Sequence, residues 1–60
     1  MTRTELINRY ENLMYKNGEF DIWEDDIEPK LATMSDAEIR RWYLQDAQFY
    51  KDRREAGGHW

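Results

Sequence analysis

The sequence predicts an all-α fold, an antiparallel helical hairpin of two long helices with a short acidic helical segment between them. Apolar residues recur every three or four positions in three stretches, which is the spacing of one helix face. The first and last stretches begin with capping sequences and end beside glycine. A short alternation over residues 19–23 would suit a strand, but no second strand exists to pair with it. Short connections favour antiparallel packing of the two long helices.

The first helix is predicted over residues 4–17. Thr2 and Glu5 are spaced as in a capping box, with Thr4 as the competing cap. Gly18, after Asn17, closes the helix because glycine adopts the left-handed conformation at little cost. The apolar face consists of Leu6, Ile7, Tyr10, Leu13 and Met14.

The acidic middle segment has helical spacing that a proline interrupts. Its apolar residues are Phe20, Trp23, Ile27, Leu31 and Met34. A proline inside a helix removes a hydrogen bond and clashes with the preceding turn, at about 3 kcal/mol. We therefore expect a break at Pro29. A short helix over residues 22–27, capped by Asp21, would precede one further turn that ends near Thr33.

The last helix is predicted over residues 36–55. Ser35 and Glu38 form a capping box, and the acids of the first turn suit the positive end of the helix dipole. Two glycines, at positions 57 and 58, end the helix. Residues 1–56 are thus expected to form a single small helical domain, and residues 57–60, including His59 and Trp60, a flexible tail.

A wide apolar stripe runs along the last helix. It consists of Ile39, Trp42, Tyr43, Phe49 and Tyr50, and Asp46 and Arg53 also fall within the arc that it covers. One neighbouring helix does not cover that width. We expect Ile39, Tyr43 and Tyr50 to face the first helix, and Trp42 and Phe49 to meet the middle segment or a second chain.

The composition favours association as the means of stabilising a chain of 60 residues. A domain of this size buries only about 60% of its unfolded surface, so small folds usually add disulfides, a metal or oligomerisation. The chain has no Cys and one His, which excludes disulfides and disfavours zinc. His59 has no nucleophile or acid constellation around it. We expect no enzyme activity, cofactor or metal, and a homo-oligomer.

The charge pattern offers two further hypotheses. An acidic run, Glu24, Asp25, Asp26 and Glu28, lacks the spacing of a calcium loop. It forms either a solvated helix face or a surface that recognises a basic partner, as an acidic mimic that blocks a nucleic-acid-binding protein. Direct DNA binding through the basic residues is disfavoured by the net charge of −4. Arg41 and Arg53 also point about 120° apart on the helical wheel.

The function that the sequence favours is a small protein–protein interaction module that self-associates. Aromatic side chains are enriched at binding hot spots, and this chain has nine of them. The candidate interaction residues are Trp23, Trp42, Leu44, Phe49 and Tyr50.

The chain as a whole, from Met1-Thr2-Arg3-Thr4-Glu5-Leu6 to Gly57-Gly58-His59-Trp60, resembles the small early proteins of lambdoid bacteriophages. These proteins are encoded in the accessory region beside the recombination and excision genes. The resemblance implies a dispensable helical protein that modulates a host or phage regulator by binding. No apolar run approaches the roughly 20 residues that span a bilayer, and we expect the protein in the cytoplasm, that of the host if it is viral.

Overall fold

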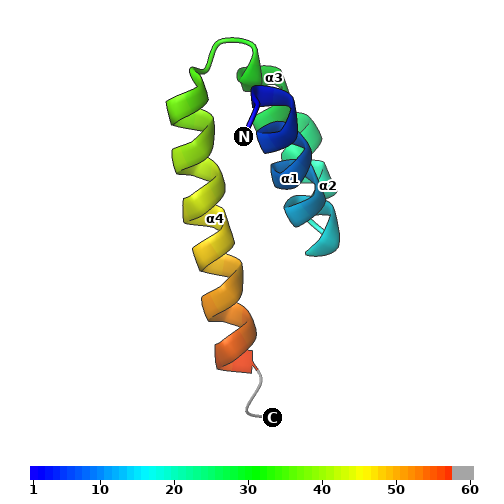
Figure 1. Cartoon of the computed structure of the whole chain (residues 1–60). Coiled ribbons are helices and arrows are strands. Elements are labelled where there is room, and N and C mark those ends of the chain that lie inside the picture. The colour runs from blue at the N-terminus through cyan, green and yellow to red at the C-terminus, as the bar shows by residue number, and fades with distance from the viewer. Residues whose placement is uncertain (58–60) are drawn as a thin grey trace.

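The computed structural model describes residues 1–57 and confirms the all-α class, since this part of the chain contains helices and no strand. The helical segments are α1 (Arg3–Lys16), α2 (Phe20–Ile22), the π-helical η1 (Trp23–Ile27), α3 (Glu28–Leu31) and α4 (Asp36–Gly57). The segments α2, η1 and α3 follow one another without a gap (Figure 1). Residues 20–31 therefore form one continuous helix, which we call the middle helix.

The predicted start and end signals of α1 are confirmed. The Thr2 hydroxyl accepts the backbone N–H of Glu5 at 3.2 Å, so Thr2 rather than Thr4 is the cap. The helix begins one residue earlier than predicted, at Arg3, and ends at Lys16. Gly18 has a φ of 75°, the left-handed conformation in which other residues are strained.

The predicted break at Pro29 is wrong, and a π-helical turn explains why. The backbone N–H of Glu28 donates to the carbonyl of Trp23, five residues back, so the helix widens immediately before the proline. Such a bulge accommodates a residue that cannot join the regular hydrogen-bond ladder. The predicted cap at Asp21 is also wrong, because the helix starts at Phe20 and its N-cap, Glu19, forms no side-chain cap bond.

The continuous middle helix changes the topology, and the prediction of an antiparallel hairpin is wrong. Residues 20–31 rise about 18 Å at 1.5 Å per residue, nearly the length of α1, and return the chain to the end where it began. As a result α1 and α4 run in the same direction, and the middle helix runs opposite to both (Figure 1). Contacts of α1 residues 3, 10 and 14 with α4 residues 36, 46 and 50 rise together along both helices, as parallel packing requires.

Tyr10 lies at the centre of the core and is fully buried. Its ring packs edge-on against Trp23 of the middle helix, with centroids 5.2 Å apart, and against Tyr43 of α4 at 5.8 Å. Its hydroxyl donates a hydrogen bond to Asp46, which explains an acid within the apolar arc of α4. The other buried apolar residues are Leu6, Met14, Trp23, Ile27, Leu31, Met34, Ile39 and Tyr50.

Contacts between the helices confirm the expected facing of Tyr43, Tyr50 and Trp42 on α4. Ile39 is fully buried, Tyr43 packs against Tyr10, and the Tyr50 hydroxyl lies 3.7 Å from the Met14 sulfur on α1. Trp42 meets the middle helix, where the Lys30 ammonium lies 5.8 Å from its ring centroid. Phe49 remains 58% exposed.

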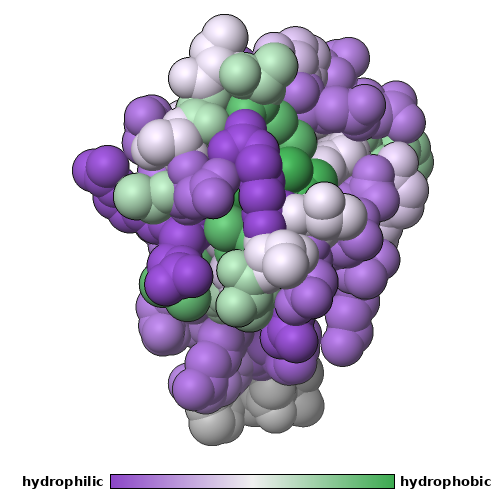
Figure 2. All heavy atoms as spheres, turned by 45° about the horizontal axis from the view of Figure 1, so that its top comes forward, coloured by the Kyte–Doolittle hydropathy of each residue, from purple (hydrophilic) through white to green (hydrophobic). Residues whose placement is uncertain are grey.

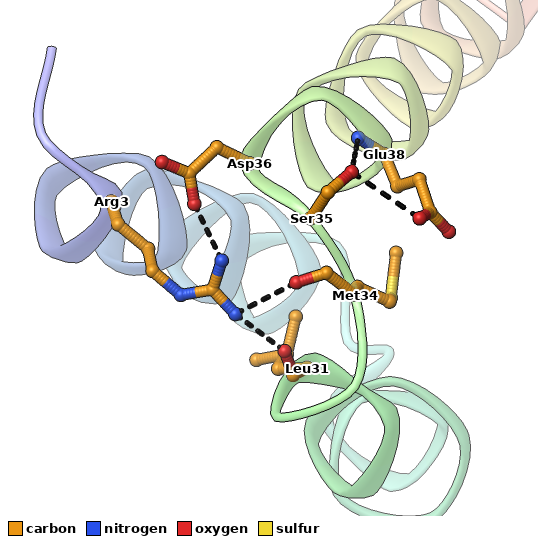
Figure 3. A network of polar contacts seen from close by, with 6 residues as sticks. All are labelled: Arg3, Leu31, Met34, Ser35, Asp36 and Glu38. Atoms are coloured by element: carbon orange, nitrogen blue, oxygen red, sulfur yellow. Dashed lines mark hydrogen bonds and ion pairs between the residues drawn. The ribbon is translucent and has the colours of Figure 1, made fainter.

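Arg3 fastens the start of α1 to the turn between α3 and α4. Its guanidinium donates to the carbonyls of Leu31 at 2.6 Å and Met34 at 3.0 Å, and pairs with Asp36 at 2.5 Å (Figure 3). These carbonyls lie at and just beyond the C-terminal end of α3, where helix geometry leaves acceptors without partners. Figure 2 looks onto this end and shows a seam of hydrophobic side chains among mostly hydrophilic ones.

Ser35 caps α4 as predicted, and the helix is longer than predicted. The Glu38 backbone N–H donates to the Ser35 hydroxyl at 3.2 Å, and that hydroxyl lies 3.2 Å from the Glu38 carboxylate (Figure 3). The helix continues through Gly57, beyond the predicted end at residue 55. His59 and Trp60, assigned to a tail from the sequence, lie outside the described residues.

Replacing Tyr10 with Phe is expected to lower the free energy of unfolding by about 1–3 kcal/mol, because the half-buried Asp46 carboxylate loses its donor. In a domain of this size each kcal/mol corresponds to about 4–8 °C in melting temperature, which circular dichroism resolves. Tyr15→Phe is the control, since its exposed hydroxyl is 3.5 Å from Glu24 and its loss should change stability by less than about 0.5 kcal/mol. Equal effects of the two variants would contradict a structural role for the Tyr10 hydroxyl.

Replacing Arg3 with Met keeps the aliphatic stem and removes all three guanidinium bonds. Urea unfolding should show a loss of about 1–3 kcal/mol, because two carbonyls at the α3–α4 turn lose a charged donor. Arg9→Met is the matched control, since Arg9 is exposed on the same helix and forms no ion pair in the described chain. A loss no greater than that of the control would show that Arg3 does not fasten this turn.

Candidate protein-interaction surface

Two of the predicted interaction residues belong to the core. Trp23 is 1% exposed, and its indole N–H donates to the Glu11 carboxylate at 3.1 Å, so both its apolar and polar parts have partners within the chain. Tyr50 is 8% exposed, and its ring packs beside Met14. The sequence gives their helical spacing but not their depth, and the structure removes both from the candidate surface.

The middle helix and α4 leave a groove between them. The hollow measures about 480 Å³, and its lining comes from α1, the middle helix and α4: Tyr10, Ile22, Asp26, Ile27, Lys30, Trp42, Gln45 and Asp46. α1 packs against both other helices, whereas the middle helix and α4 have slighter contact with each other. This side of the molecule is consequently the open one.

The walls of the groove expose apolar surface. Ile22 of the middle helix is 42% exposed, and Trp42 of α4 is half-buried opposite it. Phe49 follows Trp42 by seven residues on the same flank of α4, about 20° away on the wheel, and its ring packs edge-on against Tyr50. We call this surface the groove face and define it as Ile22, Asp26, Lys30, Trp42, Gln45 and Phe49.

Tyr10 and Asp46 form the floor of the groove and are hydrogen-bonded to each other. Burial and the neighbouring Asp46 carboxylate raise the pKa of the Tyr10 hydroxyl far above its ordinary value, so Tyr10 stays protonated and donates to Asp46. The Tyr10 hydroxyl therefore does not ionise near neutral pH. What remains for a ligand is the wall surface, which combines the apolar side chains Ile22 and Trp42 with the polar side chains Asp26, Lys30 and Gln45.

Leu44 lies on the opposite flank of α4 from the groove face. It is 58% exposed, as Phe49 is, but points about 140° away from it on the wheel. Arg40 and Arg41 lie beside it, and with Asp36, Ala37 and Leu44 itself they line a second hollow of about 510 Å³ whose surface is mainly apolar. The structure therefore separates Leu44 from Trp42 and Phe49, with which the sequence had grouped it.

The four acids predicted for recognition are all exposed, and the helix spreads them apart. Trp23 and Ile27 of the same turn point into the core. Glu24 faces α1, where Tyr15 donates to it at 3.5 Å, while Asp26 lines the groove. Asp25 and Glu28 have no side-chain hydrogen bond or ion pair within the described chain. Over residues 1–57 no group of three or more potential ligands is placed to hold a metal ion.

Sequence reasoning missed three members of the groove face, Ile22, Lys30 and Gln45. Ile22 falls outside the apolar series of the middle segment, and Lys30 stands beyond the expected break at Pro29. Only a continuous middle helix places Ile22 and Lys30 opposite α4, where Gln45 lies, so no local pattern identifies them. A second exposed aromatic pair, Tyr15 and Phe20, lies at the seam of α1 and the middle helix with centroids 6.2 Å apart.

No protein-family model, curated protein or solved structure matches this chain. Among the described helices, none combines the length and the apolar character needed to cross a membrane.

Proposed function

We propose that this protein is a small helical interaction module that associates with a second copy of itself through the groove face. The observation that carries the proposal is Phe49, a large aromatic side chain left 58% exposed beside an open groove whose walls include Ile22 and Trp42. The assembled form then acts on a host or phage regulator by contact, in keeping with the resemblance to early phage proteins.

The gain from covering this surface is large for so small a chain. Full burial of a side chain such as Phe stabilises by about 1.5–3 kcal/mol. In a twofold dimer the same patch occurs on both copies, so each residue contributes twice. Phe49, Ile22 and the exposed part of Trp42 therefore supply the apolar surface that interfaces need, and Asp26 and Lys30 supply a polar rim.

A helix is the shape that fits the groove face. Apolar grooves between two helices commonly bind the apolar side of a third helix. In a second copy, α4 offers such a helix, because its 22 residues rise about 33 Å and carry Trp42 and Phe49 on one flank. The groove face and the helix that covers it are then parts of one self-complementary surface.

Replacing Phe49 with Ala is expected to weaken self-association by at least about tenfold while the fold persists, because the exposed ring adds little to the core. Sedimentation equilibrium over a concentration range up to high micromolar measures the change. Leu44→Ala is the matched control, since Leu44 is equally exposed on the same helix but on the other flank.

Two results would contradict the proposal. A wild-type protein that stays monomeric at high micromolar concentration would remove self-association altogether. Equal weakening by Phe49→Ala and Leu44→Ala would show that the groove face is not the contact surface.

A further inference from the structure

One stripe of exposed or half-buried side chains on α4 is arranged symmetrically about the middle of the helix. Within an arc of about 80°, at 100° per residue, it runs through Glu38, Trp42, Gln45, Phe49 and Arg53. An acid lies at one end, a base at the other, two aromatics lie between them, and an amide lies near the centre. When two such stripes run in opposite directions, the acid of each therefore lies opposite the base of the other, and aromatic lies opposite aromatic.

We propose that two copies pack their α4 helices antiparallel, with Trp42 beside the partner's Phe49. The proposal rests on the proposed function and adds the orientation and register of the contact. In an antiparallel pair each step forward on one helix is a step back on the other. Four residues before Trp42 stands Glu38, and four residues after Phe49 stands Arg53, so Glu38 comes beside the partner's Arg53.

The pairing of Trp42 with Phe49 and the pairing of Glu38 with Arg53 require the same register. Matching the large aromatics brings opposite charges together at both ends of the contact, because twofold symmetry repeats the pair. Arg53 forms no ion pair within the described chain, and Glu38 is engaged only by Ser35 at the helix start. A parallel pair would place Glu38 beside the partner's Glu38 and Arg53 beside the partner's Arg53, and such like-charge contacts are unfavourable.

The same register places the twofold axis beside Gln45. Gln45 is exposed on the stripe and lines the groove. The two copies of Gln45 therefore lie near each other across the axis. The partner's Glu38 lies opposite Arg53, which is fifteen residues from Glu38 on the same helix. The two copies of Glu38 therefore lie about 22 Å apart along the helices.

Charge reversal tests the register. Glu38→Arg or Arg53→Glu alone should weaken the dimer by about tenfold at low ionic strength, because each puts like charges together at both ends. The double variant should recover the wild-type dissociation constant in sedimentation equilibrium. Glu38→Arg combined with Arg54→Glu is the control and should not recover it, because Arg54 points about 100° away from Arg53.

Mixing the two single variants tests whether the pair forms between chains. A Glu38→Arg copy and an Arg53→Glu copy have opposite charges at both ends of their contact. They should therefore form a heterodimer under conditions in which neither variant forms a homodimer. Size-exclusion chromatography of the mixture should show the dimer at concentrations where each variant alone is monomeric. An absent heterodimer would overturn the proposed pairing.

Single cysteines test the orientation, and the chain has no Cys of its own to interfere. Under mild oxidation Gln45→Cys should form a disulfide-linked dimer, whereas Glu38→Cys should not, because its copies are too far apart. Gln48→Cys lies off the stripe and is the control for random collision. Linkage through both Gln45→Cys and Glu38→Cys would indicate parallel helices and overturn the antiparallel pairing.

The outcomes separate this inference from the proposed function. A wild-type chain that never dimerises would end both. A dimer that Phe49→Ala dissociates but charge reversal leaves unchanged would preserve the groove face as the interface and end the antiparallel register.

Discussion

The fold depends on Tyr10, the buried side chain through which α1 contacts both other helices. Its ring fills the space between Trp23 and Tyr43, and its hydroxyl requires a polar partner because the group is withdrawn from water. Asp46 meets that requirement. The core formed by the described residues is small and contributes modest stability, so one satisfied polar group at its centre constrains how all the helices meet.

The arrangement around Tyr10 follows from how the chain passes Pro29. The π-helical turn keeps the middle helix continuous, and a continuous helix carries the chain back along α1. α4 must then start beside the start of α1, where Arg3 bonds to the end of α3 and to Asp36. With α1 against both neighbours, the middle helix and α4 diverge on the far side. The open groove is therefore a consequence of the backbone path.

The features that the sequence predicts correctly are those that neighbouring residues along the chain determine. The caps at Thr2 and Ser35 follow from side-chain oxygens, and the facing of Tyr43 and Tyr50 follows from helical periodicity. The course of the chain at Pro29 could not be predicted, because a break and a bulge both satisfy a residue without an N–H, and packing chooses between them. Parallel packing, the role of Arg3 and the burial of Trp23 and Tyr50 all depend on that choice. Phe49 and Trp42 were identified because the width of the stripe exceeds what one helix covers.

Core and surface on α4 are linked by adjacent residues. Tyr50 packs into the core beside Met14, and Phe49 packs edge-on against Tyr50 from outside. Asp46 accepts the hydrogen bond of the Tyr10 hydroxyl at the floor of the groove, and its neighbour Gln45 lies on the groove wall. A second chain that covers the groove face would shield these contacts from water and strengthen the Tyr10–Asp46 hydrogen bond. Because a partner that binds only the folded chain stabilises it by mass action, the proposed assembly would stabilise the fold through α4.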